Sequence, residues 1–558
     1  MGKIVIYQVL PRLFGNTNTV CKPWGGKDEN GVGKFADFTD KILSGIKELS
    51  VTHVWYTGVI EHATATDYTA YGIRPDNKYV VKGLAGSPYA IKDYYDVDPD
   101  LAVDVPSRMQ EFCSLIERTH KAGMKVIIDF VPNHVARIYD SDSAPEGIAS
   151  LGERDDKFVG FSPQNNFYYI PGAEFSPSFY IGEGDKHYYE CPAKATGNDC
   201  FSASPSVNDW YETVKLNYGV DYSNGNRCFD PMPDTWLKMR DILLFWASKG
   251  VDAFRCDMAE MVPVEFWQWC TGEVKKQYPG IIFIAEVYNP YLYEDYTKRG
   301  GFDYLYDKVG LYDSLRAVLC GNLPAGAITS WWQSLGSTKD KMLHFTENHD
   351  EQRSASDYFA GDAMRALPIF AVSALIDKNP VMLYFGQELG ERGEDAEGFS
   401  GRDGRTTIFD YWSIPSVRRW VTGGNSGLTA YEKSARFAYK KLLSVATKQK
   451  GISEGDFFDL MYVNHYSPGF NPYSNYLFAR RYKDELYIIG VNFWSGETDA
   501  KINIPSHLFE HWGMKEGIYS CSELISKQSK DAEVSSHIPF AVMILPYGTA
   551  VWKCIPKK

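Results

Sequence analysis

The sequence predicts an α/β protein built on a (β/α)8 TIM barrel, with a domain inserted after the third strand and a C-terminal antiparallel β-sandwich. Three observations predict this architecture. Eight short apolar segments alternate with segments of helical periodicity, which is typical of a parallel β/α barrel. The alternation stops over residues 135–216. After Ala446 it gives way to closely spaced strand-like segments, which are typical of an antiparallel domain.

The barrel elements can be assigned in chain order. Strands are expected at residues 4–9, 52–57, 125–131, 251–254, 281–286, 302–306, 342–346 and 381–385. Helices with apolar residues at helical spacing are expected at 36–49, 107–121, 235–249 and 264–276. Parallel strands need long crossover connections, so helices between successive strands indicate a barrel and not a meander.

The stretch 135–216 is rich in Ser, Pro, Gly, Asn and aromatic residues and shows no clear periodicity. A structureless loop of that length is improbable inside a barrel, so we interpret it as an inserted domain. Near the C-terminus, strands are expected at 476–480, 485–492, 541–545 and 549–552. The predicted domains are therefore 1–134 and 217–450 for the barrel, 135–216 for the insert and 451–558 for the C-terminal β domain.

Bulk properties limit the partners. The 558 residues are 44% hydrophobic, as expected of a globular protein, and the formal net charge of −13 argues against a nucleic-acid partner. No run of eighteen or more apolar residues occurs, so we expect no membrane span and no membrane partner. The first expected strand begins at Ile4 and leaves no room for a signal peptide, which favours a cytoplasmic protein. The alternative is a periplasmic or secreted protein whose leader was removed. We expect a monomer.

The cysteine pattern indicates neither a zinc site nor a disulfide framework. Ten cysteines occur without CxxC pairs or accompanying histidines. Cys191 and Cys200 are close enough in sequence for a disulfide to remain open as the less favoured alternative. Cys256 should face away from its two sequence neighbours and pack in the core.

Polar residues follow the expected strands at the end where barrel enzymes carry their chemistry. Arg255 and Asp257 are two positions apart, so their side chains should point to the same side of a strand. Glu286 ends the next strand, which suggests a site with two carboxylates. A structural ion pair or a helix cap would explain each of these residues singly. Such readings do not easily explain polar groups at four strand ends, namely Asp129, Asn133, His134, Arg255, Asp257, Glu286, His349 and Asp350.

Four segments carry a resemblance to a known family. DFVPNH (129–134), GVDAFRCD (250–257), IAEV (284–287) and ENHD (347–350) resemble the four signature regions of the α-amylase family of retaining glycoside hydrolases, glycoside hydrolase family 13. They occur in that family's order, and the insert lies where the family carries its domain B. The resemblance implies that Asp257 is the nucleophile, Glu286 the general acid/base and Asp350 the third carboxylate of a double displacement.

The same resemblance implies further roles. Tyr89, His134, Arg255 and His349 match residues that bind substrate or orient the nucleophile. Asn133 matches a ligand of a structural calcium. The remainder of that calcium site is not recognisable, since Glu260 and Met261 stand where amylases often carry Lys-His and Asn217 where some members have Asp. No cofactor is expected for the chemistry itself.

The resemblance leaves three functions open. The first is a hydrolase that cleaves α-1,4-glucosidic bonds in starch-type glucans or maltooligosaccharides. The second is a 4-α-glucanotransferase, in which a sugar hydroxyl replaces water in the same machinery. The third is a non-catalytic scaffold or binding relative, which is disfavoured because Asp257, Glu286 and Asp350 are all present. Linkage preference and endo or exo action are not determined by these motifs.

Overall fold

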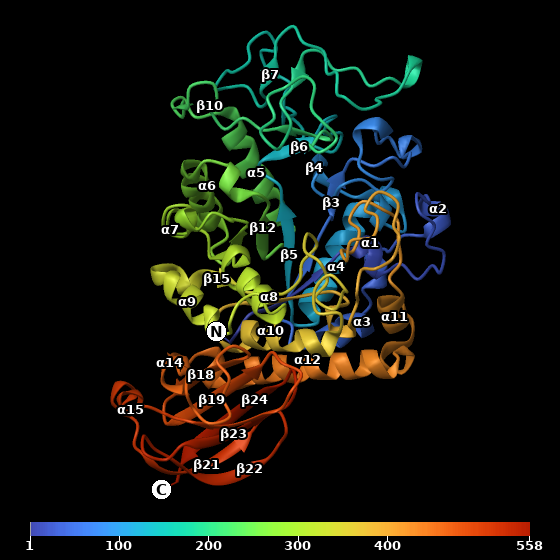
Figure 1. The fold of residues 1–558 in the computed structure, drawn as a ribbon. Helices are drawn as coiled ribbons and strands as arrows, with labels where there is room; N and C mark the ends of the chain where they lie inside the picture. The colour runs from blue at the N-terminus through green and yellow to red at the C-terminus, as the bar shows by residue number, and fades with distance from the viewer. Residues whose placement is uncertain (1, 558) are drawn as a thin grey trace.

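A computed structural model describes residues 2–557, and its central element is a closed parallel barrel (Figure 1). The sheet order is β15-β14-β13-β12-β5-β2-β1-β16, and a parallel bridge between His344 and Val381 joins its two edges. The eight strands are β1 (Val5–Val9), β2 (His53–Tyr56), β5 (Lys125–Phe130), β12 (Ala253–Cys256), β13 (Ile282–Ala285), β14 (Tyr304–Tyr306), β15 (Met342–Leu343) and β16 (Val381–Tyr384). The predicted barrel is confirmed, with a strand at each expected place.

One strand was predicted two residues too early. The expected strand at 251–254 is β12 at Ala253–Cys256, which pairs with β5 through Ala253 opposite Ile127 and Cys256 opposite Phe130. The predicted strand ends at Phe254, because the run of apolar residues in the sequence ends there. Backbone pairing in a barrel continues through Arg255, because the barrel interior near its mouth accepts a polar side chain.

Helices cover the outside of the barrel. The four predicted helices appear as α3 (Asp40–Lys47), α4 (Arg108–Lys121), α5 (Asp234–Ser248) and α6 (Val264–Gln277). The first begins later than predicted, because the hydroxyl of Thr39 accepts a hydrogen bond from the backbone N–H of Ile42 and caps it. Later in the chain, α8 (Asp313–Leu319), α10 (Ala363–Leu375) and α12 (Ala430–Lys448) complete the layer.

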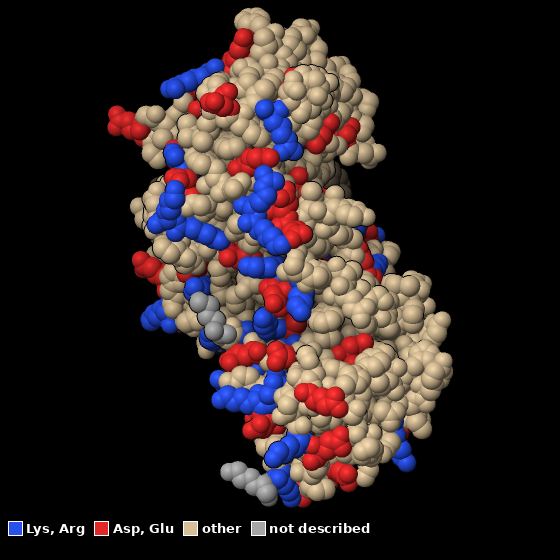
Figure 2. Space-filling model, turned by 90° about the vertical axis from the view of Figure 1, so that its left-hand side faces the viewer, with Lys and Arg blue, Asp and Glu red and all other residues tan. Residues whose placement is uncertain are grey.

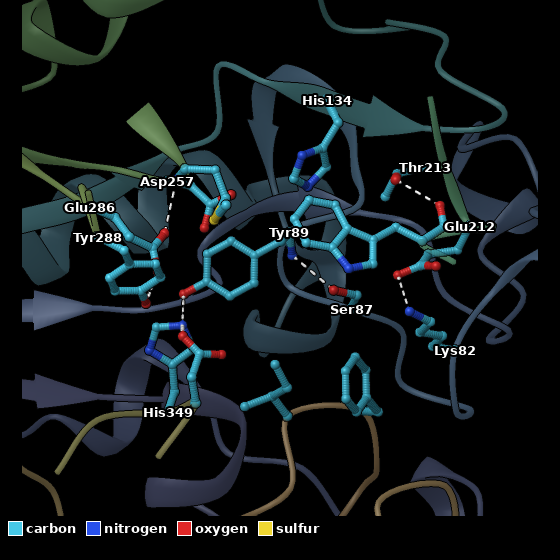
Figure 3. Close-up of a pocket in the computed structure, with 15 residues that line it drawn as sticks. Lys82, Ser87, Tyr89, His134, Glu212, Thr213, Asp257, Glu286, Tyr288 and His349 are labelled. Atoms are coloured by element: carbon cyan, nitrogen blue, oxygen red, sulfur yellow. Dashed lines mark hydrogen bonds and ion pairs between the residues drawn. The ribbon is translucent and has the colours of Figure 1, made fainter. Parts of the chain in front are cut away.

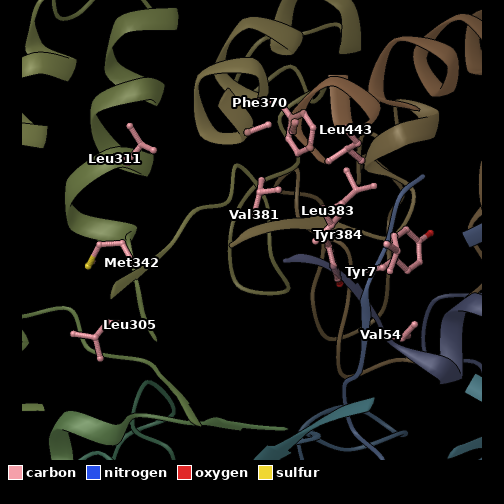
Figure 4. Packing of buried hydrophobic residues seen from close by; sticks show 14 of the residues in the cluster. Tyr7, Val54, Leu305, Leu311, Met342, Phe370, Val381, Leu383, Tyr384 and Leu443 are labelled. Carbon is pink, nitrogen blue, oxygen red and sulfur yellow. The ribbon is translucent and has the colours of Figure 1, made fainter. Parts of the chain in front are cut away.

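Side chains on the barrel strands alternate between two cores. Ile6, Trp55, Ile127, Ala253 and Ile284 are among the residues that fill the barrel interior. Their strand neighbours point outward against the helices, and Figure 4 shows Val381 and Leu383 of β16 beside Phe370 of α10 and Leu443 of α12. Cys256 belongs to this outer core and is fully buried, as predicted. The same alternation turns Arg255 and Asp257 inward with Ala253.

The segment after β5 forms an irregular lobe beyond the mouth of the barrel (Figure 1, top). It contains only short ladders, in which β6 (His134–Ala136) pairs with β9 (Thr213–Lys215), β7 (Tyr169–Ile170) with β8 (Ala193–Lys194), and β10 (Val220–Asp221) with β11 (Asn226–Arg227). Strands of two or three residues are too short to produce a periodic pattern, which explains why residues 135–216 show none. Cys191 and Cys200 lie in the lobe as free thiols, so the disulfide is not formed.

The C-terminal part is a β-sandwich under the opposite end of the barrel (Figure 1, bottom). Its larger sheet has the order β17-β18-β19-β24-β21-β22, and the second sheet pairs β20 with β23. The expected strands appear as β18 (Asn475–Tyr482), β19 (Glu485–Asn492), β23 (Phe540–Ile544) and β24 (Thr549–Pro556). The sequence reasoning missed β17 (Asp456–Asp459), β20 (Thr498–Ile502), β21 (Gly517–Glu523) and β22 (Ser529–Val534). Gly490 lies against Ile544 of the second sheet, where a Cβ would come within 2.6 Å of the Ile544 side chain.

Charged residues of both signs are interspersed on the face of the molecule drawn in Figure 2. Elsewhere in the structure, exposed side chains of opposite charge form local pairs, such as Lys440 with Glu48 at 2.9 Å and Lys557 with Asp531 at 2.5 Å. Among residues 2–557, no helix combines the length and the apolar composition needed to cross a bilayer.

Candidate active site

Arg255 connects two carboxylates at the mouth of the barrel. Its side chain is fully buried, and Nη1 donates a hydrogen bond of 2.6 Å to Oδ1 of Asp257. Nη2 of the same guanidinium lies 2.8 Å from Oε2 of Glu286, and Nε donates to the hydroxyl of Tyr306 at 3.1 Å. The structure therefore brings Arg255, Asp257 and Glu286 together, and one buried cation orients both carboxylates.

The environment of Glu286 favours its protonated form. Burial raises the pKa of Glu286, the Arg255 charge opposes this, and the neighbouring Asp257 raises the pKa further. The backbone N–H of Met258 donates to Oε2 at 2.8 Å, and the hydroxyl of Tyr288 donates to Oε1 at 2.5 Å. A carboxyl group with a raised pKa and a fixed orientation can act as a general acid near neutral pH.

Asp257 has a different set of contacts. Burial raises the pKa of Asp257, while Arg255 lowers it by charge and by a direct hydrogen bond. Arg255 Nη1 also lies 3.5 Å from Oδ1 of Asp129, whose other oxygen accepts a hydrogen bond of 3.0 Å from Trp55 Nε1. Asp129 therefore contacts the guanidinium of Arg255 as well as the indole of Trp55.

A wall of aromatic and imidazole rings faces the carboxylates. The hydroxyl of Tyr89 lies 2.6 Å from Nε2 of His349, and their ring centroids are 5.0 Å apart. Burial and the Arg255 charge hold the pKa of His349 well below its usual value, so the imidazole is neutral. His349 Nε2 lies 3.0 Å from Oδ2 of Asp350, whose side chain is 43% exposed.

His134 lies on the inserted lobe's side of the same cavity. Burial lowers the pKa of His134 to about 3, with further contributions from Lys215 and Lys82, so this imidazole is also neutral. The centroid of the His134 ring lies 5.2 Å from that of the Trp210 ring. A neutral imidazole can donate one hydrogen bond and accept another, which suits a ligand rich in hydroxyl groups.

The cavity that these side chains line has a volume of about 280 Å3. Figure 3 shows Tyr89 at its centre, with Glu286 and Tyr288 on one side and Lys82 and Glu212 on the other. Apart from Asn133 and Arg255, which lie behind the wall, all residues assigned to the site from the sequence line this cavity.

Comparison with known proteins shows which protein family has this combination of barrel, insert and site. The profile described as "Alpha amylase, catalytic domain" matches residues 8–433. The chain belongs to the α-amylase family. The family model and the related alpha-amylases support a glycosidase, and Asp257, Glu286 and Asp350 of the cavity supply the carboxyl groups that such an enzyme uses.

Individual members of the α-amylase family are distant in sequence. Alpha-amylase 3 of Dictyoglomus thermophilum is 22% identical over 474 residues, which cover 81% of this chain and 78% of that protein. An alpha-1,4-glucan:maltose-1-phosphate maltosyltransferase of Picrophilus torridus is 35% identical over 299 residues, which cover 53% of this chain and 35% of that protein. The crystal structure of an alpha-amylase from Geobacillus thermoleovorans, complexed with acarbose, superposes with a TM-score of 0.64 at 18% identity. That superposition covers 100% of this chain and 99% of that one, and it shows the shared fold.

The residues around Asn133 do not fit the structural calcium that the family resemblance leaves possible there. The ammonium of Lys215 donates to Oδ1 of Asn133 at 2.5 Å and lies 2.6 Å from Oδ1 of Asp199. Nδ2 of Asn133 donates to the carbonyl of Gly197 at 2.8 Å. A divalent cation at this place would lie against a buried ammonium and would lack a free Asn133 oxygen.

Several residues of the cavity were missed from the sequence. Tyr288 lies two positions after Glu286, so the spacing that paired Arg255 with Asp257 could have pointed to it. Gln8, near the C-terminal end of β1, does not line the cavity but contacts a residue that does, since its Nε2 lies 2.8 Å from His349 Nδ1. Lys82 and Glu212 come from segments without periodicity, and only the fold brings them to the site.

Proposed function

We propose that this enzyme is a retaining α-glycosidase that cleaves α-1,4-glucosidic bonds in starch-type glucans or maltooligosaccharides. The observation that carries the proposal is the bridge of Arg255 between Asp257 and Glu286 at a cavity that Tyr89, His134 and His349 also line. Two carboxyl groups on one site are what a double displacement at an anomeric carbon requires.

In the first step, a carboxylate oxygen of Asp257 attacks the anomeric carbon, and the bond from that carbon to the glycosidic oxygen breaks. Glu286 gives its proton to the departing oxygen, so the leaving sugar departs as a neutral alcohol. The product of this step is a covalent glycosyl ester on Asp257. The sugar hydroxyls are bound by Asp350, Tyr89, His134 and His349 while the sugar ring distorts towards the transition state.

In the second step, the ionised Glu286 takes a proton from water, and the water oxygen attacks the anomeric carbon. The ester bond to Asp257 breaks, and both carboxyl groups return to their starting states. Two inversions at one carbon give net retention of the α configuration.

Transfer to a sugar hydroxyl is the second candidate function, because the relatives include both hydrolases and transferases by name. The Dictyoglomus protein is named an alpha-amylase, whereas the Picrophilus protein is named a maltosyltransferase. The chemistry differs only in the acceptor that enters the second step.

Chromatography of maltoheptaose digests over time tests the proposal, with the Asp257→Asn variant as the blank. Products that are all shorter than the substrate support hydrolysis. Early products longer than the substrate would show glucanotransferase activity instead. No difference from the blank would refute an enzyme that acts on α-1,4-glucans.

A further inference from the structure

A buried ion pair forms one end of the active-site cavity. Nζ of Lys82 lies 3.0 Å from Oε1 of Glu212, and the two side chains are 14% and 5% exposed. Lys82 follows the short helix Lys78–Val80, and Glu212 immediately precedes β9 of the inserted lobe. Both side chains line the cavity, and Figure 3 shows the pair on the far side of Tyr89 from Glu286.

Glu212 has an unused hydrogen-bonding atom. Its Oε2 is buried and has no hydrogen-bond partner among the described residues. Leaving a buried carboxylate oxygen unpaired is unfavourable, whereas a hydroxyl donor from a ligand would satisfy it. A carboxylate that accepts and an ammonium that donates together match two neighbouring hydroxyls of a sugar ring.

Apolar side chains line the cavity beside the Lys82–Glu212 pair, and a backbone hydrogen bond connects two of the segments involved. Trp210, Ile408 and Phe409 line the cavity together with Lys82 and Glu212. The backbone N–H of Ala85 donates a hydrogen bond of 3.1 Å to the carbonyl of Phe409, which joins the segment after Lys82 to the segment after β16. This hydrogen bond holds the two segments together beside the ion pair.

The position of the proton donor gives the cavity a direction. Under the proposed mechanism Glu286 protonates the oxygen of the departing sugar, so the departing part of the substrate lies on the side of Glu286 and Tyr288. The part that stays attached to the enzyme must extend the opposite way, past Tyr89 towards Lys82 and Glu212. In an α-1,4-glucan this part carries the non-reducing end.

We propose that Lys82, Trp210 and Glu212 form a subsite for the sugar at the non-reducing end of the glucan, so that the enzyme acts from chain ends. The indole supplies a flat apolar surface for one face of the sugar ring, and the ion pair binds its hydroxyls. This inference rests on the proposed function, because the direction of the cavity follows from the role of Glu286.

A pair of chromogenic substrates tests the inference. One is 4-nitrophenyl α-maltoheptaoside with free hydroxyls, and the other carries an ethylidene group across O4 and O6 of its non-reducing terminal sugar. Chromatography that quantifies the shortened nitrophenyl glycosides reports cleavage of both substrates without a coupling enzyme. The inference predicts at least ~10-fold slower cleavage of the blocked substrate, since the block removes hydroxyl donors to a charged acceptor. Equal rates on both would overturn the inference and leave the proposed function intact, whereas no cleavage of either would refute the proposed function.

Substitutions in the pair give a second test. Glu212→Gln and Lys82→Met should each lower kcat/KM for the open heptaoside by about 10- to 100-fold, and they should reduce the preference for the open over the blocked substrate. Glu183→Gln, an exposed Glu of the same lobe, is the matched control and should keep both values. Lys82→Arg retains the cation and serves as a milder variant if Lys82→Met does not fold. Folded variants, verified by circular dichroism, that keep the wild-type preference would show that the pair is only structural and would overturn the inference.

Discussion

The hydroxyl of Tyr288 donates a hydrogen bond of 2.5 Å to Oε1 of Glu286. A donor to the ionised form stabilises the carboxylate, so this contact lowers the pKa of Glu286 against the effect of burial. The contact thus tunes the group that must be protonated in the first step and ionised in the second. Because Tyr288 acts through Glu286, it is a positioning residue.

Replacing Tyr288 with Phe should raise the pKa of Glu286 and move the basic limb of the kcat/KM profile to higher pH. Loss of one charge-assisted hydrogen bond should also lower kcat by about 10-fold. Rates measured across the pH range on maltoheptaose provide the check, and Tyr291→Phe is the control because Tyr291 is 94% exposed. An unshifted basic limb in Tyr288→Phe would contradict the assignment of Glu286 as the acid.

The two carboxylates can be distinguished by chemical rescue. Asp257→Gly and Glu286→Ala should each reduce turnover by about four orders of magnitude while the protein stays folded. Azide added to Glu286→Ala should attack the covalent intermediate and yield the α-glycosyl azide. In Asp257→Gly, azide should take the place of the nucleophile and yield the β-glycosyl azide from an activated α-glycosyl fluoride. The opposite pair of anomers would mean that the two roles are reversed.

The ammonium of Lys215 should make this junction independent of calcium. Lys215 is buried and contacts Asn133 and Asp199, so Lys215→Met leaves a carboxylate without its partner. Because Asp199 is one-third exposed, we expect a loss of about 2 kcal/mol, visible as a lower Tm. The exposed Lys157→Met serves as control, and EDTA should leave the wild-type Tm unchanged. A Tm that falls in EDTA and recovers with calcium in the wild type, but not in Asn133→Ala, would show that calcium is bound at this junction after all.

A buried histidine predicts how barrel stability depends on pH. His344 lies 2.8 Å from Asp377 and 3.2 Å from Asp307. Burial lowers the pKa of His344, but these carboxylates outweigh it and raise the pKa to about 9. Since the folded pKa exceeds the unfolded value, this stabilisation is fully present below about pH 6.5 and is lost as pH rises through about 9.

The comparison of His344→Gln with wild type checks this dependence, because it cancels the titration of groups that the two proteins share. The variant should have a lower Tm below pH 6.5, and the difference should shrink as pH approaches 9. His537→Gln, at an exposed histidine of the C-terminal domain, is the matched control and should leave the Tm unchanged across this pH range. A difference in Tm that is constant across this pH range would refute a protonated His344.

Most of the barrel could be predicted because each of its strands repeats one simple pattern of apolar residues between helices. The errors have physical causes. β12 was placed early because Arg255 looked like a strand terminus, although a barrel interior accepts it. In the C-terminal sandwich, β21 and β22 alternate exposed and buried residues over short spans, and such weak patterns are not distinct from loops in the sequence.

The site was predictable where its residues follow strands and match signature motifs, as Asp257 and Glu286 do. Lys82, Trp210 and Glu212 carry no such signal, because they come from irregular segments that meet only in the folded protein. The possible calcium ligand Asn133 shows a second limit of the sequence motifs. A motif can retain one ligand residue while a distant Lys215 supplies the positive charge.

Proton NMR of the first products most directly tests whether Asp257 forms a covalent intermediate. Maltoheptaose is mixed with a high concentration of enzyme, and the anomeric signals of the new reducing ends are followed before mutarotation equilibrates them. The double displacement predicts that the α anomer appears first and the β anomer only later, by mutarotation. Initial appearance of the β anomer would show a single displacement by water and would contradict the roles assigned to Asp257 and Glu286.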